Sequence, residues 1–455
     1  MAMVGPATSK LAGAAATMLL VAVMVLTPAG AWAAHAADDG GGPSADGSSS
    51  SPAISADGRY VAFVSDADNL SDEDQNRFTN VFVRDLSTNT TTLVSRQSAG
   101  AGARGADGSS SDPAISADGR YVAFLSTASN LIPAGTRHAD RHNVYVRDMV
   151  ANTTRLVSVP SVRPWGDPWG PRISADGRVV AFGLERNRLL RPRADLIVVQ
   201  RGARRRFVAA PPTPPSPTPP PNMPAPADEV TPTARPRAAA TDVTPAPLPP
   251  SRTVAPGFTA FNLSADGWHL TFIADGGFSF RDLASRHTKR LRTWGVASDD
   301  APLSMTGDGR IVAFNDDESG TVINTRTGRR RTLGCDRWEA RCDWTLGVGS
   351  GRFRATCSGP VIAANGRSVA CEGAEAGTVL DARTGIVTRS LMTGRMACVL
   401  CAVDPPVHAD DLGLSADGGT IVYTDLRDGQ PRDSYITDVH VLDTRTGQTT
   451  LVSRQ

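Results

Sequence analysis

The sequence predicts an all-β fold: a seven-bladed β-propeller of four-stranded antiparallel blades, interrupted by a disordered Pro-rich insert. Three observations predict it. A motif centred on Asp-Gly or Asn-Gly recurs seven times along the 455 residues. The segment after each turn, such as YVAFVS at 60–65, is apolar on both faces, as expected for a sheet covered on both sides. Aromatic residues are only 5% of the chain and glycine is abundant, which favours many short strands over long helices.

The repeated motif is a tight hairpin, read most clearly in ISADGRYVAF at 54–63 and again at 115–124. Glycine supplies the positive φ that such a turn needs, and Asp or Asn binds nearby backbone amides. In the sixth copy Asn365 replaces the aspartate, a change that a turn tolerates and a catalytic carboxylate does not. The predicted structural turn residues are Asp57, Gly58, Asp118, Gly119, Asp176, Gly177, Asp266, Gly267, Asp308, Gly309, Asn365, Gly366, Asp417 and Gly418.

A second hairpin follows each motif: an apolar strand, a turn, and a strand rich in Thr or Arg, as in NVFVRDLSTNTTTLVS at 80–95. Together the two hairpins make a four-stranded meander, and meanders packed around an axis form a propeller. The predicted blades lie near 51–97, 112–159, 169–208, 259–294, 301–334, 357–391 and 411–455.

These repeats resemble the WD40-like propeller repeat of TolB and of many exported bacterial proteins. The resemblance covers nearly all of residues 45–455 except one insert, and it is most specific in the first two copies and the last. It implies the fold strongly and the function weakly, because a propeller is a scaffold that carries many different sites. Unlike in TolB, we expect no separate N-terminal domain before the first blade.

The N-terminus reads as a secretory signal peptide over residues 1–36. Lys10 is the only charge before Asp38, MLLVAVMVL at 18–26 is an apolar core, and small residues follow at cleavage spacing. An uncleaved anchor is the alternative, although the apolar run is about half of the roughly 20 residues that span a bilayer. We therefore expect a secreted, periplasmic or cell-envelope protein, with a flexible segment at 37–50 and no membrane span after cleavage.

The insert lies at residues 209–256, where 17 of the chain's 33 prolines fall. Proline at this density favours extended chain and cannot enter a central strand. We interpret it as a disordered tether between blades three and four. There are two alternatives. The segment could be recognised by a proline-binding partner, or it could connect two incomplete rings of blades.

The connection between the second and third strands differs among blades. It is short in blades four to six and long in blades one, two, three and seven, at 66–79, 127–142, 184–193 and 425–437. In a closed ring these four blades are neighbours, so their loops form one raised crescent. Because binding residues often lie on loops held by a rigid scaffold, we expect the crescent to bind a protein or a cell-envelope polymer. Tolerated surface insertion is the alternative.

The charges and motifs do not indicate catalysis. Lys plus Arg (47) nearly balance Asp plus Glu (46), so no global field indicates nucleic acid. No G-x-S-x-G nucleophile motif occurs, and we expect no enzyme activity, no cofactor and a monomer. A self-contained lyase, lactonase or hydrolase with a channel-facing site is the alternative. A weak calcium candidate is Asp72, Asp74 and Asn76, whose oxygens alternate as in a calcium loop but without its glycine and distant glutamate.

All six cysteines lie in the last third of the chain, and export makes disulfides possible. Six cysteines allow 15 pairings, which sequence alone does not resolve. Cys357 and Cys371 fall at nearly mirrored distances from the sixth turn, where cross-strand spacing suits a disulfide. A local scheme would then join Cys335 with Cys342 and Cys398 with Cys401, the latter pair being a C-x-x-C that could otherwise bind metal.

Overall fold

The structure is a computed structural model, and the chain divides into two units, Met1–Ala34 and His35–Gln455. All described residues belong to the second unit. They are residues 43–74, 77–98, 104–133, 142–158, 167–186, 193–201, 251–256, 258–274, 277–291, 303–316, 319–333, 355–375, 384–392, 396–400, 410–427 and 436–455. Within these ranges no helix is long and apolar enough to cross a membrane.

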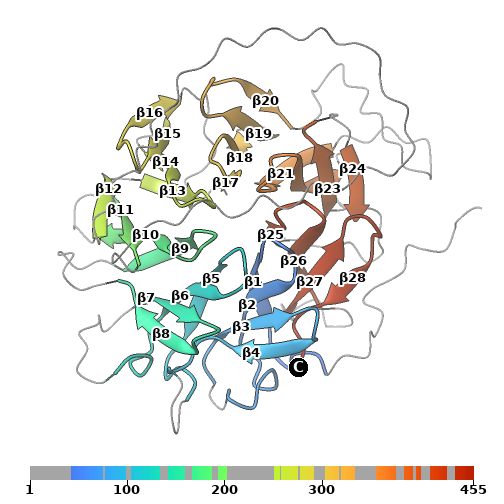
Figure 1. The fold of residues 1–455 in the computed structure, drawn as a ribbon. Coiled ribbons are helices and arrows are strands. Elements are labelled where there is room, and N and C mark those ends of the chain that lie inside the picture. The colour runs from blue at the N-terminus through green and yellow to red at the C-terminus, as the bar shows by residue number, and fades with distance from the viewer. Residues whose placement is uncertain are drawn as a thin grey trace, which may run out of the picture. The chain divides into compact units, whose positions relative to one another are not determined.

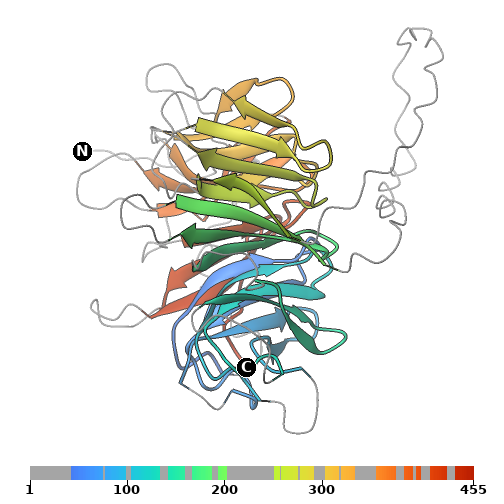
Figure 2. The same ribbon diagram turned by 90° about the vertical axis from the view of Figure 1, so that its left-hand side faces the viewer.

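The described residues form 28 strands in seven four-stranded antiparallel sheets (Figures 1 and 2). Blades one to three contain β1 (Ser49–Ile54), β2 (Tyr60–Ser65), β3 (Asn80–Asp85), β4 (Thr90–Leu93), β5 (Ser110–Ile115), β6 (Tyr121–Ser126), β7 (Asn143–Asp148), β8 (Thr153–Leu156), β9 (Pro168–Ile173), β10 (Val179–Arg186), β11 (Arg193–Gln200) and β12 (Ser251–Pro256). Blades four and five contain β13 (Phe258–Leu263), β14 (His269–Ala274), β15 (Gly277–Asp282), β16 (Thr288–Leu291), β17 (Leu303–Met305), β18 (Ile311–Asp316), β19 (Ser319–Asn324) and β20 (Arg330–Thr332). Blades six and seven contain β21 (Ala355–Ile362), β22 (Ser368–Glu375), β23 (Thr384–Ser390), β24 (Met396–Leu400), β25 (Asp410–Leu414), β26 (Thr420–Leu426), β27 (Thr437–Asp443) and β28 (Thr449–Leu451).

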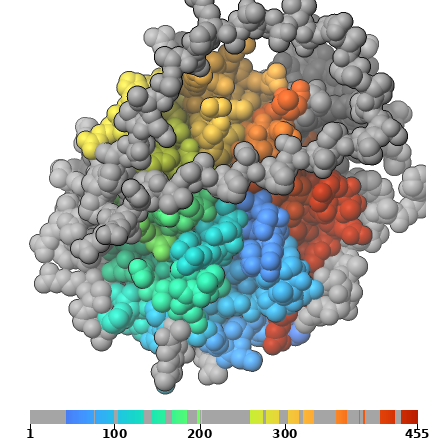
Figure 3. Space-filling model, in the orientation of Figure 1, coloured from blue at the N-terminus to red at the C-terminus, as the bar shows by residue number. Residues whose placement is uncertain are grey.

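Successive sheets pack against one another until the last meets the first. The innermost strands contact in the order β1, β5, β9, β13, β17, β21 and β25, and β1 then packs against β25, β26 and β27. Atoms of the first and last sheets lie in direct contact in the space-filling view (Figure 3). The predicted all-β propeller of four-stranded antiparallel blades is therefore confirmed.

The turn motif has a second function that its sequence did not reveal: backbone hydrogen bonds join the turns of neighbouring blades into a closed circle. Each bond runs from an amide in one turn to a carbonyl in an adjacent turn. The donor–acceptor pairs are Ala56–Ala117 (3.0 Å), Ala117–Ala175 (3.0 Å), Ala175–Ala265 (2.7 Å), Asp266–Gly307 (3.1 Å), Gly307–Ala364 (2.9 Å), Asn365–Ala416 (3.0 Å) and Ala416–Ala56 (2.9 Å). Because Ala416 donates back to Ala56, the circle closes through all seven turns.

Within each turn the aspartate, or Asn365 in blade six, organises the local backbone. Asp57 Oδ1 accepts hydrogen bonds from the Ser55 hydroxyl (2.6 Å) and the Arg59 amide (3.0 Å), while Gly58 has a φ of +76°. In blade two, Gly119 also lies against the ring of Tyr60 in blade one, and a Cβ there would come within 2.2 Å of it. Glycine is thus required both by the backbone conformation and by the close approach of the neighbouring blade.

The core lies between the sheets. One cluster joins Phe63 and Phe82 of blade one to Val422 and Val441 of blade seven, and the opposite face of blade one contributes Ala62 and other residues to a cluster with blade two. Phe63 and Phe82 are fully buried, and each stabilises the fold by roughly 1.5–3 kcal/mol. The prediction that second strands are covered on both faces is confirmed.

Three predicted boundaries differ from the structure. The strand β12 pairs with β11, so the insert separates the third and fourth strands of blade three, and residues 251–256 belong to the blade. Part of the segment predicted as flexible is held in place: Ala45 is buried, and its amide donates to the carbonyl of Ser453 (2.9 Å). In blade six, β23 occupies 384–390, which was predicted as the outermost strand; the predicted third strand, near 377–382, lies outside the described residues.

Candidate functional site

The long connections between second and third strands leave the same end of their blades. In blades one, two and seven they join β2 to β3, β6 to β7 and β26 to β27, and only parts of them belong to the described residues. In blade three the predicted loop is shorter, because β10 and β11 pair as far as Arg186 and Arg193. The long loops among the four predicted are therefore those of blades seven, one and two.

A polar contact closes the base of each of these loops. We call it the stem clip: an Asn or Asp that opens the third strand, bonded to a Ser that follows the fourth strand. The three clips are Asn80 with Ser95 (2.7 Å), Asn143 with Ser158 (3.3 Å) and Asp438 with Ser453 (2.8 Å). Each serine hydroxyl also accepts the next strand amide, from Val81 (3.1 Å), Val144 (2.9 Å) or Val439 (3.2 Å).

The stem clip accompanies the long loops. In blade four the third-strand position that corresponds to Asn80 is Gly277, and in blade five the sequence has Gly334, outside the described residues, two residues after the end of β20, where blade one has Ser95 two residues after β4. Neither pair can make the bond, because one partner lacks a side chain. The serine of each clip is the last residue of the sequence LVS, which occurs at 93–95, 156–158 and 451–453. The role of this repeat was not recognised from the sequence.

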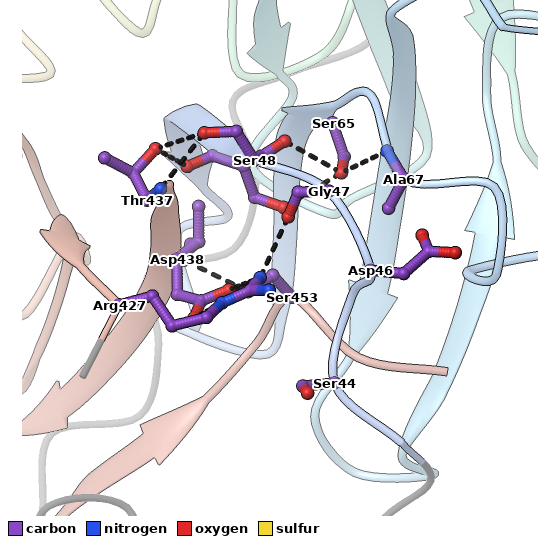
Figure 4. Close-up of polar contacts among 12 residues, drawn as sticks. Ser44, Asp46, Gly47, Ser48, Ser65, Ala67, Arg427, Thr437, Asp438 and Ser453 are labelled. Atoms are coloured by element: carbon purple, nitrogen blue, oxygen red, sulfur yellow. Dashed lines mark hydrogen bonds and ion pairs between the residues drawn. The ribbon is translucent and has the colours of Figure 1, made fainter. Parts of the chain in front are cut away.

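In blade seven the clip includes a buried ion pair (Figure 4). Arg427 donates to both carboxylate oxygens of Asp438, at 2.7 Å each, and also to the carbonyl of Gly47 (2.8 Å). These hydrogen bonds raise the pKa of Arg427, so the guanidinium stays charged. Thr437 completes the contact: its amide donates to the Ser48 hydroxyl (3.0 Å) and its own hydroxyl donates to the Ser49 carbonyl (2.8 Å). The base of the blade-seven loop is thus attached to blade one.

Short lead segments before β1 and β5, residues 43–48 and 104–109, hold the beginnings of the other two loops. In blade one, Asp46 accepts the Asp68 amide (2.9 Å), and Asn69 donates to the Ser44 carbonyl (2.8 Å). In blade two, Asn130 donates in the same way to the Gly105 carbonyl (2.9 Å). The repeated ADGSSS at 45–50 and 106–111 is the sequence signal that could have predicted these contacts.

The aspartate of the second lead segment, Asp107, shows how firmly this contact is made. Burial alone would raise its pKa, but hydrogen bonds from the Ser129 hydroxyl and amide (both 2.6 Å) and from the Asn130 amide outweigh burial. The pKa of Asp107 therefore lies below its ordinary value. The carboxylate remains ionised and holds the loop.

Two exposed apolar side chains lie at the long loops. Among the described residues the exposed large hydrophobic side chains are Phe78 (43%), Leu426 (39%), Val150 and Met392. Phe78 lies in the blade-one loop and Leu426 at the start of the blade-seven loop, so two of these four lie on neighbouring loops of the candidate site. Exposed aromatic and aliphatic side chains at the centre of a polar surface are typical of protein interfaces.

The innermost strands of the same blades carry polar side chains at a strained position. Ser51, Asp112 and Asp411 occupy β-bulges with φ of 51°, 50° and 55°, whereas blades three and six have Gly170 and Gly359 there. A side chain in this conformation costs about 1 kcal/mol relative to glycine. Asp112 and Asp411 are exposed, and Asp411 accepts the Ser51 amide (3.3 Å) across the blade boundary. The innermost strands of blades one, two and seven therefore each carry a polar side chain at this bulge.

The calcium candidate divides among different environments. Asp74 is buried and accepts a hydrogen bond from Asn80 (3.0 Å), so it supports the stem clip of blade one. Asp72 is exposed and Asn76 lies outside the described residues. Within the part of the chain that the structure describes, no three His, Cys, Asp or Glu side chains gather as a metal site. Calcium binding stays a prediction.

The cysteines and histidines lie elsewhere. Cys371 is buried and disulfide-bonded; Cys357 pairs in register with Gly373, two residues along the same strand from Cys371. The disulfide between Cys357 and Cys371 stays a prediction. So do the pairs Cys335–Cys342 and Cys398–Cys401, because Cys335, Cys342 and Cys401 lie outside the described residues. His269 stacks on Phe280 and His440 on Tyr423, both within blades.

Comparison with known proteins supports the fold. No protein-family model matches the chain, and no curated protein matches it. Among solved structures, an oligogalacturonate lyase in complex with manganese is 11% identical with a TM-score of 0.51, the match covering 89% of this chain and 91% of that one. TolB from Acinetobacter baumannii is 12% identical with a TM-score of 0.40, covering 86% of this chain and 63% of TolB.

The propeller domain of the Trilobed protease from Pyrococcus furiosus is 10% identical, with a TM-score of 0.43, covering 76% of this chain and 86% of that domain. This chain thus spans less than two thirds of TolB. These neighbours include enzymes as well as TolB, and at such identities they share a fold with this chain and no more. The chain has the β-propeller fold.

Proposed function

We propose that the protein is an exported, non-catalytic propeller scaffold that binds a partner protein, or another cell-envelope ligand, at the loop ends of blades seven, one and two. The observation that carries this proposal is the stem clip. Insertions that a surface merely tolerates need no bonded base, yet these three loops have one and the described short-loop blades four and five do not. Loops of this kind, held on a rigid scaffold, are where binding residues usually lie.

The chemistry of this end favours a protein partner. Phe78 and Leu426 offer apolar anchors, and the exposed carboxylates of Asp112 and Asp411 add charge beside them. Interfaces of this composition combine a desolvated apolar centre with a polar rim. The predicted signal peptide and the cysteine content favour an oxidising location outside the cytoplasm.

A second function, catalysis within the ring, has one observation in its favour. The bulges at Ser51, Asp112 and Asp411 keep side chains in a conformation that usually belongs to glycine, and such strain often accompanies active sites. Arg172 on β9 is close enough to Asp112 to interact electrostatically with it, so opposite charges adjoin there. Turnover of an acidic sugar or ester abolished by Asp112→Asn and Asp411→Asn would favour this alternative.

The test uses matched pairs of exposed apolar residues. Phe78→Ser with Leu426→Ser removes both anchors from the loops, and Val150→Ser with Met392→Ser removes two from the opposite, turn end. Partners are captured by crosslinking on intact cells and compared among the three proteins. We expect the loop variant to lose its partner and the control to keep it. Equal capture by both variants would refute the site.

A further inference from the structure

The opposite end of the propeller, which carries the tight turns, is divided by charge. In blades seven, one and two, the outermost strands and the turns, counting the last residue of the third strand as part of the turn that follows it, contain six Asp and four Arg. The described turns and outermost strands of blades four, five and six have three Asp and nine Arg or Lys. We call six of the exposed arginines of this second sector the basic face: Arg286, Arg310, Arg326, Arg329, Arg331 and Arg367.

Part of the difference arises from one cross-strand position. In blades one and two the arginine after the turn glycine is neutralised by an aspartate at the end of the third strand. Arg59 binds both carboxylate oxygens of Asp85 (2.9 and 2.7 Å), and Arg120 binds Asp148 in the same way (3.0 Å each). Paired guanidinium groups such as these offer little to a ligand.

Blades five and six lack this aspartate. The register places Asn324 and Ser390 where blade one has Asp85. Arg310 contacts the carboxylate of its own turn, Asp308 (3.2 Å), and Arg367 follows Asn365 where other blades have Asp. Positive charge is therefore left in solvent over two adjacent blades.

Hydrogen bonds between blades make the basic face continuous. Lys289 Nζ on β16 donates to the carbonyls of Thr325 (3.1 Å) and Arg326 (2.9 Å) in the blade-five turn. Arg331 on β20 donates to the carbonyl of Leu391 in blade six (3.3 Å). The three blades thus present their arginines side by side.

Protection of an exposed strand edge is the simplest structural reason for arginines on outer strands. That role would apply to every blade, yet β4 and β28 read TTTL and TTL and carry no charge. The strand β20, Arg330–Thr332, is exposed throughout and carries two arginines. Outer-strand charge is thus concentrated in β16 and β20, whereas β8 carries one arginine and β24 none, and such a local concentration suits a polyanion.

We propose that the basic face binds an acidic polysaccharide. Arginine is suited to this ligand because its planar fork donates two parallel hydrogen bonds to a carboxylate. At the edge of the face, Trp268 occupies the position of the turn arginine in blade four. It packs against the core cluster that contains Leu270 and remains half-buried, which leaves part of the indole for a sugar ring.

The experiment measures binding of the full chain to alginate, which carries one carboxylate per sugar, by calorimetry at low salt. Neutral dextran and inorganic polyphosphate are the comparison ligands. The test variant combines Arg326→Gln, Arg329→Gln and Arg367→Gln. The control removes the same charge elsewhere, with Arg155→Gln, Arg178→Gln and Arg445→Gln, all exposed residues of blades two, three and seven.

We expect alginate to bind, dextran not to bind, and the test variant to bind alginate about ten-fold more weakly through loss of charge-assisted contacts. Added salt should weaken binding of the wild type more than that of the test variant, because exposed charges are screened. Trp268→Leu, with its folding checked by thermal melting, should weaken alginate binding as well. An equal loss in the control triple variant, or binding of polyphosphate without binding of alginate, would overturn the proposal.

Discussion

Single glycines in the turns show how much one methyl group can cost. At Gly119 an added Cβ would meet the Tyr60 ring at 2.2 Å, whereas at Gly447, with a similar φ of +73°, nothing lies within 4 Å. Both substitutions to alanine incur backbone strain, about 1 kcal/mol each, and only the first also forces neighbouring blades apart. We expect Gly119→Ala to lower the free energy of unfolding by about 2–4 kcal/mol, and Gly447→Ala by about 1 kcal/mol. Denaturant titration compares them; equal losses would show that the contact between blades is unimportant.

A histidine in the fourth turn makes stability depend on pH. Burial alone would lower the pKa of His269, but Asp266, at 3.2 Å, raises it above its ordinary value. The ion pair therefore makes its full contribution to the free energy of unfolding below the ordinary histidine pKa of about 6.5. This holds as long as Asp266 is ionised, and the pKa of Asp266 is itself lowered. The contribution of the ion pair is lost as the pH rises through the higher pKa of the folded state. Unfolding free energies of the wild type and His269→Gln should converge with rising pH; a constant difference would contradict this prediction.

Within a blade, the stem clip should govern the local stability of its loop. Ser95→Ala removes the hydroxyl that donates to Asn80 and accepts the Val81 amide, both of which are buried. We expect a loss of about 1–3 kcal/mol, because a buried donor and a buried acceptor each lose a partner. Amides of residues 66–74 should exchange with solvent faster, whereas those of the equivalent blade-two loop, 127–133, should not. Unchanged exchange in the first loop would show that the clip does not hold it.

The elements that sequence could predict are those formed by neighbouring residues. The turn from Ser55 to Tyr60 spans six residues, so its chemistry is visible in one string of letters. The strand β12 could not be assigned in the same way, because it pairs with β11 across a long insert and has no motif of its own. Bonds such as that between Asn69 and Ser44 join separate repeats, and only the recurrence of ADGSSS hinted at them.

The candidate site was predicted in outline and not in detail. Loop length located it at the ends of blades seven, one and two, but it also suggested blade three, where the structure extends the strands instead. The exposure of Phe78 and Leu426, and the contact of Asp411 with Ser51, depend on how distant blades meet. Blade packing sets these properties, and the local pattern of residues does not contain them.

For the ring as a whole, the junction between the first and last blades is the only one whose two sides are far apart in sequence. This junction is held by the backbone hydrogen bond between the turns of blades seven and one, by the apolar core between these blades, and by side-chain hydrogen bonds. Arg84 is buried in blade one and donates to the carbonyls of Arg454 (3.1 Å) and Gln455 (2.9 Å). Arg147 donates equivalently to Gln97 (2.9 Å) between blades one and two. Closure thus repeats an ordinary contact between blades, and Arg427, which is paired with Asp438 within blade seven, adds a bond to the Gly47 carbonyl of the lead segment before blade one.

That ion pair provides a test of closure with its own internal control. Asp438 stands where blades one and two have Asn80 and Asn143, so Asp438→Asn keeps the bond to Ser453 but leaves Arg427 without its counter-charge. We expect the single variant to lose about 3 kcal/mol, because a largely buried charge is left unpaired.

Adding Arg427→Met should restore much of that loss, because the double variant resembles the uncharged clip of blade one. The coupling between the two substitutions, measured by a double-mutant cycle, should therefore be large. Since Arg427 also binds the Gly47 carbonyl, the single variant should expose the lead segment at 43–48 to protease sooner than the segment at 104–109. Additive effects of the two substitutions would show that the ion pair does not stabilise the base of the blade-seven loop.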